Sequence, residues 1–133
     1  MGNAKYRHLA GIAPAEHDVA DMGVVLRGMG FGVTTRLNMG LEETERELER
    51  FYATVRPGDL AMVYYSGHGG SVGGDDFLLP ADFQAQGTER MAKLRAYALK
   101  DVLDRLKGQG ATVRLLVFDA CRDASMVTTK SGQ

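Results

Sequence analysis

Two apolar runs in the chain end abruptly at small or polar residues. The first, L-A-M-V-Y-Y-S, covers Leu60–Ser66, and the second, V-R-L-L-V-F, covers Val113–Phe118. Runs of this length and composition, bounded by glycine-containing turns, are typical of strands buried on both faces of a parallel sheet. A weaker alternation, F-G-V-T-T-R-L, predicts a further strand over Phe31–Leu37, and Phe77–Pro80 predicts a short edge strand because Pro80 cannot donate to a ladder.

Helical spacing of apolar residues lies between these runs. It predicts amphipathic helices over Ala15–Met29, Leu41–Val55 and Leu99–Leu106, with a turn at Pro57–Asp59. Residues 1–14, the glycine-rich stretch 67–74 and most of 82–92 are interpreted as loops. Alternating strands and helices predict an α/β fold whose parallel sheet carries helices on both faces.

Composition narrows the function classes. The 133 residues fit one domain, and 16 basic against 17 acidic side chains without a basic stripe argue against nucleic-acid or anionic-membrane partners. No apolar run approaches a membrane span, and no signal sequence is recognised. A single cysteine fits a reducing compartment, so we expect a cytoplasmic protein.

Candidate chemistry follows the two main strands. His68 comes just after the first and Cys121 just after the second. Since the carboxyl ends of neighbouring parallel strands lie side by side, a thiol nucleophile and an imidazole base would meet there. The amide N–H groups of Gly69 and Cys121 would form an oxyanion hole, and together these groups predict acyl transfer.

The motifs Y-Y-S-G-H-G-G at 64–70 and D-A-C-R-D at 119–123 resemble the histidine and cysteine motifs of the caspase and metacaspase superfamily, especially its bacterial metacaspase-like members. Cys121 follows His68 by 53 positions, close to the spacing of about 50 in caspases. G-N-A-K-Y, P-G-D-L and F-L-L-P-A-D extend the resemblance over nearly the whole chain. The resemblance implies a caspase-like three-layer α/β/α sandwich with a mostly parallel sheet.

The resemblance also implies roles. His68 would be the general base and acid and Cys121 the nucleophile of a cysteine endopeptidase that forms an acyl-enzyme. By motif position, Asp18, Ser66 and Asp119 match the acidic pocket that takes Arg or Lys in metacaspases. A carboxylate floor suits a guanidinium fork, so we expect cleavage after basic residues.

Two departures from the family pattern concern the ends. Relatives have an apolar strand before the G-N-x-x-Y segment, and a small-subunit part after the catalytic cysteine. We therefore interpret residues 1–133 as a large-subunit caspase-like domain truncated at both ends. A second chain supplying the small-subunit part is a possible partner beside the peptide substrate.

Other interpretations stay open. The glycines of 67–74 fit no phosphate-loop pattern, and Asp75, Asp76 and Asp82 do not match the longer acidic stretches of calcium-dependent relatives, so no metal or cofactor is predicted. His8 and His17 are interpreted as surface residues. The alternatives to a peptidase are a non-catalytic caspase-like module that pairs with a second chain, and a hydrolase of small amides.

Overall fold

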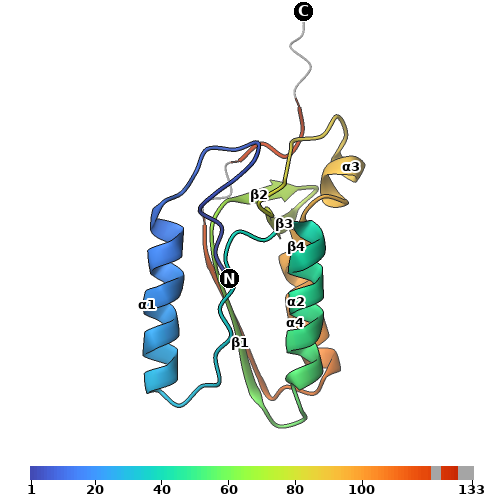
Figure 1. Cartoon of the computed structure of the whole chain (residues 1–133). Helices are drawn as coiled ribbons and strands as arrows, with labels where there is room; N and C mark the ends of the chain where they lie inside the picture. The colour runs from blue at the N-terminus through green and yellow to red at the C-terminus, as the bar shows by residue number, and fades with distance from the viewer. Residues whose placement is uncertain (121–123, 129–133) are drawn as a thin grey trace, which may run out of the picture.

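A parallel pair of strands stands between helices in the computed structural model, which describes residues 1–120 and 124–128. The elements, in chain order, are α1 (Pro14–Gly28), α2 (Leu41–Thr54), β1 (Leu60–Ser66), β2 (Gly69–Val72), β3 (Asp75–Leu78), α3 (Glu89–Lys93), β4 (Tyr97–Ala98), α4 (Leu99–Gly108) and β5 (Val113–Asp119). β1 and β5 pair in parallel, from Leu60 opposite Val113 to Ser66 opposite Asp119. Helix α1 lies on one side of this pair, and α2 and α4 lie on the other (Figure 1). The predicted α/β fold with helices on both faces is confirmed.

The three main helices begin and end close to the predicted positions. Helix α1 has Pro14 in its first turn, where proline needs no amide partner, and the chain leaves it through Gly30 at φ 92°. Helix α2 follows Gly40, which has no capping side chain. The carboxylate of Asp82 accepts the Leu41 N–H at 3.0 Å instead, so a distant loop caps this helix.

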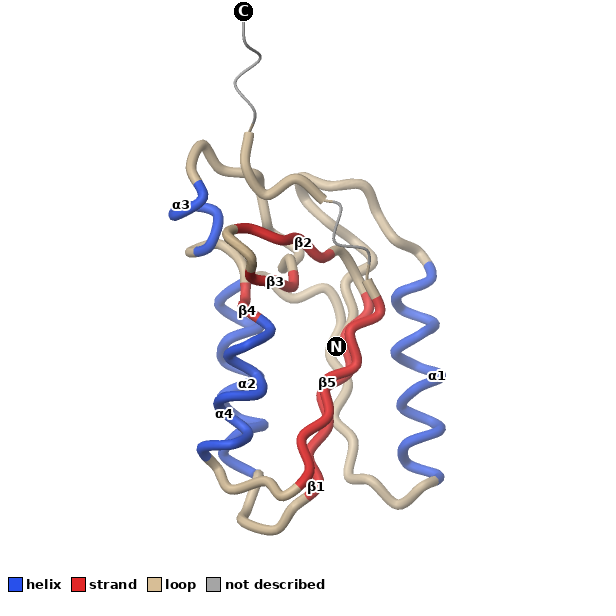
Figure 2. The backbone as a smooth tube through the Cα atoms, turned by 180° about the vertical axis from the view of Figure 1, so that it is seen from behind, coloured by secondary structure: helices blue, strands red, loops and turns tan. Residues whose placement is uncertain are grey.

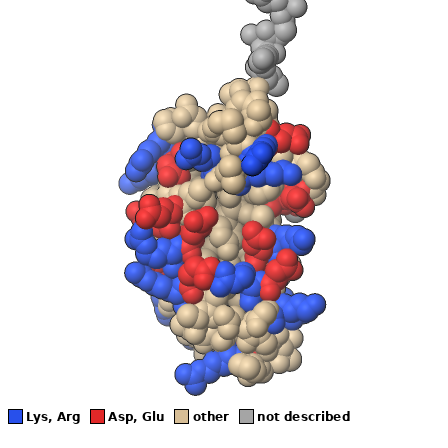
Figure 3. All heavy atoms as spheres, turned by 90° about the vertical axis from the view of Figure 1, so that its right-hand side faces the viewer, with Lys and Arg blue, Asp and Glu red and all other residues tan. Residues whose placement is uncertain are grey.

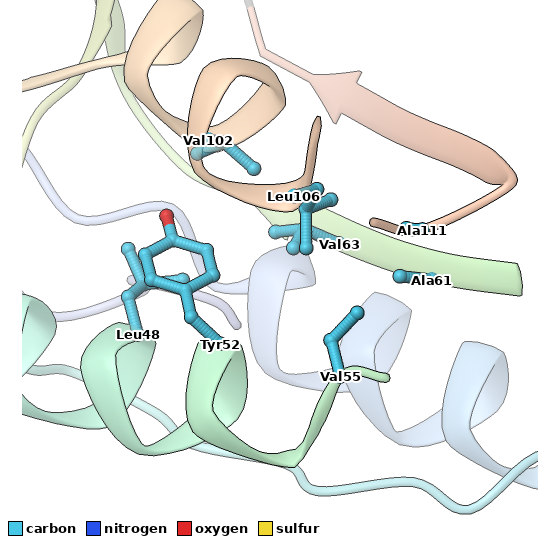
Figure 4. Close-up of a cluster of buried hydrophobic side chains, with 8 residues drawn as sticks. All are labelled: Leu48, Tyr52, Val55, Ala61, Val63, Val102, Leu106 and Ala111. Carbon is cyan, nitrogen blue, oxygen red and sulfur yellow. The ribbon is translucent and has the colours of Figure 1, made fainter. Parts of the chain in front are cut away.

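The main hydrophobic core lies between β1 and the helices α2 and α4. Ala61 and Val63 point from β1 toward Tyr52 of α2 and Leu106 of α4 (Figure 4). Val55, Leu48, Val102 and Ala111 complete the same buried cluster. The Tyr52 hydroxyl is paired with that of Tyr97 at 2.8 Å, so the one polar side-chain atom among these eight residues has a partner.

The expected burial of both strands on both faces is wrong. In β1, buried residues alternate with exposed or half-buried ones up to Tyr65, and in β5 every side chain is exposed or half-buried. The reason is that the helices cover the two strands unequally. Helix α4 packs on one face of β5, whereas α1, on the opposite face of the sheet, contacts β1. Val113, Leu115 and Val117 therefore remain exposed although their composition is that of a buried strand.

The strand predicted over Phe31–Leu37 does not form. Only Leu37 makes a single parallel bridge, to Gly2, and the residues before it are extended without a ladder. A strand needs a hydrogen-bonded neighbour, and residues 31–36 are separated from β1 by a cavity rather than by a strand.

The glycine-rich stretch 67–74 is a hairpin rather than a loop. β2 and β3 pair antiparallel around Gly73 and Gly74, at φ 60° and 82°, and β4 adds a third short strand. The predicted edge strand at Phe77–Pro80 corresponds to β3, shifted toward the hairpin turn. Within 82–92, the sequence analysis missed the start of the short helix α3, whose N-cap Thr88 accepts the Met91 N–H. The tube view of Figure 2 shows this small sheet beyond the carboxyl end of β1.

Surface charge is mixed on the side of the molecule that carries α2 and α4. Figure 3 shows lysine and arginine interleaved with aspartate and glutamate there, without a large area of one sign. Among the described residues, no helix has the length and apolar character needed to traverse a bilayer.

Candidate active site

The backbone of His68 is held from three directions just after β1. Its N–H donates to the Tyr6 hydroxyl at 2.8 Å, and its carbonyl oxygen accepts from the Tyr65 hydroxyl at 2.7 Å and from the Leu79 N–H at 3.1 Å. Burial raises the pKa of both tyrosine hydroxyls, so both remain protonated donors at neutral pH. The half-buried His68 is therefore fixed on a rigid backbone between β1 and the hairpin.

The imidazole of His68 has a defined tautomer. Its Nε2 lies 2.7 Å from the carbonyl oxygen of Ala10. Because a carbonyl oxygen only accepts hydrogen bonds, Nε2 carries the proton, and Nδ1 of the neutral ring is left as a base. The Tyr6 ring packs against the imidazole at 4.7 Å in an edge arrangement and keeps it in this orientation.

Gly67 is required by packing at this corner. A Cβ atom there would lie 2.5 Å from the Tyr65 hydroxyl oxygen and 2.8 Å from the Tyr6 hydroxyl oxygen. Both hydroxyls hold the His68 backbone, so they cannot move aside without releasing it. The structure thus gives a packing reason for the glycine that precedes His68.

The three predicted substrate-binding residues lie together at the carboxyl ends of the two strands. Ser66 is paired with Asp119 in the β1–β5 ladder, and its hydroxyl donates to the Asp18 carboxylate at 3.1 Å. Tyr64, which sequence reasoning missed, donates its hydroxyl to Asp119 at 3.3 Å. Burial, and then the negative charges of Asp119 and Asp18, raise the pKa of Tyr64, so this hydroxyl stays a donor between two carboxylates.

We call Asp18, Tyr64, Ser66 and Asp119 the acidic cluster. In the part of the chain that the structure describes, neither of its carboxylates has an arginine or lysine within ion-pair distance. Hydroxyl groups hold the carboxylates in place without neutralising them. An incoming cation would therefore find two negative charges already oriented.

Cys121 lies outside the described residues, and so does any geometry that involves it. Ser66 lies two positions before His68, and Asp119 lies two positions before Cys121. Ser66 and Asp119 face each other across the β1–β5 ladder. Gly69, the other predicted oxyanion contributor, is buried and is the first residue of β2.

The remaining sequence candidates lie apart from this corner. His8 and His17 are exposed, as predicted. Asp76 accepts the Ser71 hydroxyl at 2.6 Å, and Asp82 caps α2. Across residues 1–120 and 124–128, no group of three or more histidine and acidic side chains is arranged to hold a metal ion.

Comparison with known proteins identifies the family of this chain. Residues 1–133 match the caspase domain, a family of peptidases, over the entire sequence. The chain belongs to the caspase family. The resemblance inferred from the histidine and cysteine motifs is thereby confirmed.

This caspase domain is similar to two curated proteins. It is 24% identical over 122 residues to human mucosa-associated lymphoid tissue lymphoma translocation protein 1, covering 92% of the chain and 14% of that protein. It is 37% identical over 83 residues to metacaspase-5 of Trypanosoma cruzi (strain CL Brener), covering 55% of the chain and 17% of that protein. The chain thus spans less than a fifth of the length of either relative.

Proposed function

We propose that this caspase domain is a cysteine endopeptidase that cleaves after Arg or Lys through His68 and Cys121. The observation that carries the proposal is the acidic cluster at the carboxyl ends of β1 and β5. Its member Ser66 lies only two positions before His68. Family membership supports the peptidase class. The relative named a metacaspase supports the choice of class within the family.

His68 supplies the proton transfers in this mechanism. With Nε2 committed to the Ala10 carbonyl, Nδ1 takes the proton of the Cys121 thiol, and the thiolate attacks the carbonyl carbon of the scissile peptide bond. The resulting oxyanion receives hydrogen bonds from the Gly69 and Cys121 amides. The C–N bond then breaks, and the imidazolium protonates the leaving amine.

The second half of the reaction uses the same base. A thioester joins the substrate acyl group to Cys121, and His68 removes a proton from the water that attacks it. The carboxylic acid product leaves, and the thiol proton returns from His68. No added cofactor is needed for this sequence of steps.

Specificity for basic residues comes from the acidic cluster. A substrate arginine would place its guanidinium between Asp18 and Asp119, and a lysine would place a single ammonium there. Tyr64 and Ser66 orient the two carboxylates and keep their positions before substrate arrives.

A peptide assay tests both parts of the proposal. Fluorogenic peptides ending in Arg or Lys should be hydrolysed and the matched Asp peptide should not, with turnover abolished in Cys121→Ala and His68→Ala. Asp119→Asn and Asp18→Asn should lower kcat/KM for the Arg peptide by about 100-fold, because each removes a charge-assisted interaction of about 3 kcal/mol. Asp21→Asn, an exposed neighbour on α1, is the control for charge alone.

Two outcomes would contradict the assignment. Preference for the Asp peptide would exclude the acidic cluster as the specificity pocket. Turnover that survives Cys121→Ala would exclude the dyad.

The alternative function is a non-catalytic module that pairs with a second chain. It is favoured by the exposed apolar residues of β5, namely Val113, Leu115 and Val117. In that case size-exclusion chromatography would show a stable associated species, and iodoacetamide or a peptide electrophile would label Cys121 no faster than a free cysteine.

A further inference from the structure

Residues 124–128, which we call the return segment, begin three positions after Cys121. One side of the return segment is bonded to the loop at Gln86. The Gln86 N–H donates to the Met126 carbonyl at 3.0 Å, and the Thr128 N–H donates to the Gln86 carbonyl at 2.7 Å. The two hydrogen bonds belong to a parallel β-bridge, so the backbone of the return segment is fixed against this loop.

The other side of the return segment packs on β2. Met126 is buried, with 2% of its surface exposed. A Cβ atom added at Gly70 would lie 2.5 Å from the Met126 Cγ, 2.7 Å from its Sδ and 3.3 Å from the Ala124 carbonyl oxygen. Met126 therefore fills the space that a side chain at residue 70 would need. Gly70 directly follows Gly69, the predicted oxyanion donor.

Met126 belongs to a second buried cluster, which is separate from the main core. This cluster also contains Leu79, and Tyr6 and Ala124 pack against it. Two of these residues hold His68, because the Tyr6 hydroxyl accepts its N–H and the Leu79 N–H donates to its carbonyl oxygen. The second cluster thus connects the backbone supports of His68 with the return segment.

The chain on both sides of Cys121 is anchored. Asp119 lies two positions before Cys121 and is paired with Ser66 in the β1–β5 ladder. Ala124 lies three positions after Cys121 and contacts the second cluster. A shift of Ala124 would therefore change where the chain can place the thiol. Displacements of about 1 Å at a reacting group lower rates by up to about 100-fold.

We propose that Met126 is a positioning residue for the reaction of Cys121. Packed against Gly70, Met126 fixes the return segment on the cluster that also holds His68, so that the thiol and the imidazole share one rigid support. This inference rests on the proposed dyad of His68 and Cys121. Met126 acts on acylation and not on capture of the basic side chain, since the acidic cluster is built from α1, β1 and β5.

Steady-state hydrolysis of the Arg peptide by the full chain tests the role of Met126. Met126→Ala should lower kcat at least about tenfold, because the return segment loses its anchor, and KM should stay within about twofold. Met126→Leu conserves the side-chain volume and should keep kcat within about twofold. Leu106→Ala removes a fully buried side chain from the main core, so it controls for lost stability and should leave the kcat of the folded protein unchanged.

A compensating pair of variants tests the contact with Gly70. Gly70→Ala should lower kcat at least about tenfold, because its methyl group meets the Met126 Cγ, which is too close to the backbone to rotate away. In the double variant Gly70→Ala with Met126→Ala, the added methyl occupies part of the space that Met126 leaves. The double variant should therefore have a higher kcat than either single variant. Gly28→Ala is the matched glycine control, since an added Cβ there has nothing within 4 Å.

Alkylation by iodoacetamide reports on Cys121 without peptide turnover, because it is the only cysteine in the chain. The midpoint of the rate against pH should lie below the value of about 8.5 for a free thiol, and His68→Ala should raise it. Met126→Ala should raise the midpoint as well, whereas Met126→Leu should not.

The two variants distinguish failure of the dyad from failure of the positioning role. A midpoint that is the same in the native chain and in His68→Ala would exclude the dyad and, with it, the role of Met126. A midpoint raised by His68→Ala but not by Met126→Ala would overturn the role of Met126 alone. The same conclusion would follow if the double variant lost the product of the two single losses, or if Leu106→Ala lowered kcat as much as Met126→Ala.

Discussion

The two faces of the β1–β5 pair differ although the same two strands build both. Toward α2 and α4, Ala61, Val63 and Tyr65 of β1 are buried, and Tyr65 stacks on Phe118 at 5.4 Å. Toward α1, Leu60, Val113 and Leu115 remain 46%, 40% and 43% exposed. The apolar composition of a strand therefore determines how much of its surface could be buried. The helices that pack on the strand determine how much of that surface is buried in the fold.

The largest effect is expected on the closed face. Leu106→Ala should lower the free energy of unfolding by about 3 kcal/mol, because Leu106 is fully buried between α4 and β1 and its loss leaves a cavity. Urea denaturation measures the change. Leu115→Ala on the open face is the matched control and should cost less than about 1 kcal/mol. Equal losses for both variants would mean that the open face is covered in solution.

An intermediate effect is expected from the Met1 amine beside α1. Its pKa is about 6 in the folded chain and 8.0 in the unfolded chain, so the unfolded chain binds more protons between these values. Stability should therefore rise with pH from 6 to 8, by at most about 3 kcal/mol, with the full penalty present below pH 6. Urea midpoints across this range should show the rise in the free chain and a flatter profile in the same chain acetylated at Met1.

A rise of the same size in the acetylated chain would assign the pH dependence to other groups. The comparison requires intact Met1 in both samples, which mass spectrometry verifies.

The smallest effect on stability is expected from polar substitutions on the open face. Leu115→Thr and Val117→Thr should change the free energy of unfolding by no more than about 0.5 kcal/mol, because both side chains are substantially exposed. They should reduce binding of an apolar dye such as anilinonaphthalene sulfonate and reduce self-association in analytical ultracentrifugation. Unchanged dye binding would show that this face is not the apolar surface accessible in solution.

Local signals in the sequence were sufficient for the three long helices and for the two main strands. Pro14 and Gly30 delimit α1, and helical spacing over 41–55 and 99–106 gave the other two long helices within two residues. The acidic cluster was accessible through motif positions, since Asp18, Ser66 and Asp119 do lie together. Tyr64 was missed because its role depends on its position beside Asp119 of the neighbouring strand, and the local sequence around Tyr64 does not indicate this neighbour.

The errors arose where structure depends on partners distant in sequence. Phe31–Leu37 alternates like a strand, yet it lacks the neighbour that would complete its ladder. Residues 67–74 were interpreted as a loop because glycine weakens strand propensity, whereas the structure forms β2 and a hairpin turn there, with two adjacent glycines supplying the positive φ values of the turn. Ala10 as the partner of His68 was not predictable, because any residue type offers a backbone carbonyl.

The hydrogen bonds made by residues 1–3 also constrain the order in which parts of the chain can fold. Gly2 is fixed by Arg36 and Asn38, and Asn3 is fixed by Ser66, so residues 1–3 are placed by partners that are synthesised after them. During translation residues 1–3 cannot complete their hydrogen bonds until Ser66 has left the ribosome, while α1 and α2 are free to form earlier from local contacts. Residues 1–3 are thus among the last parts of the fold to reach their final positions.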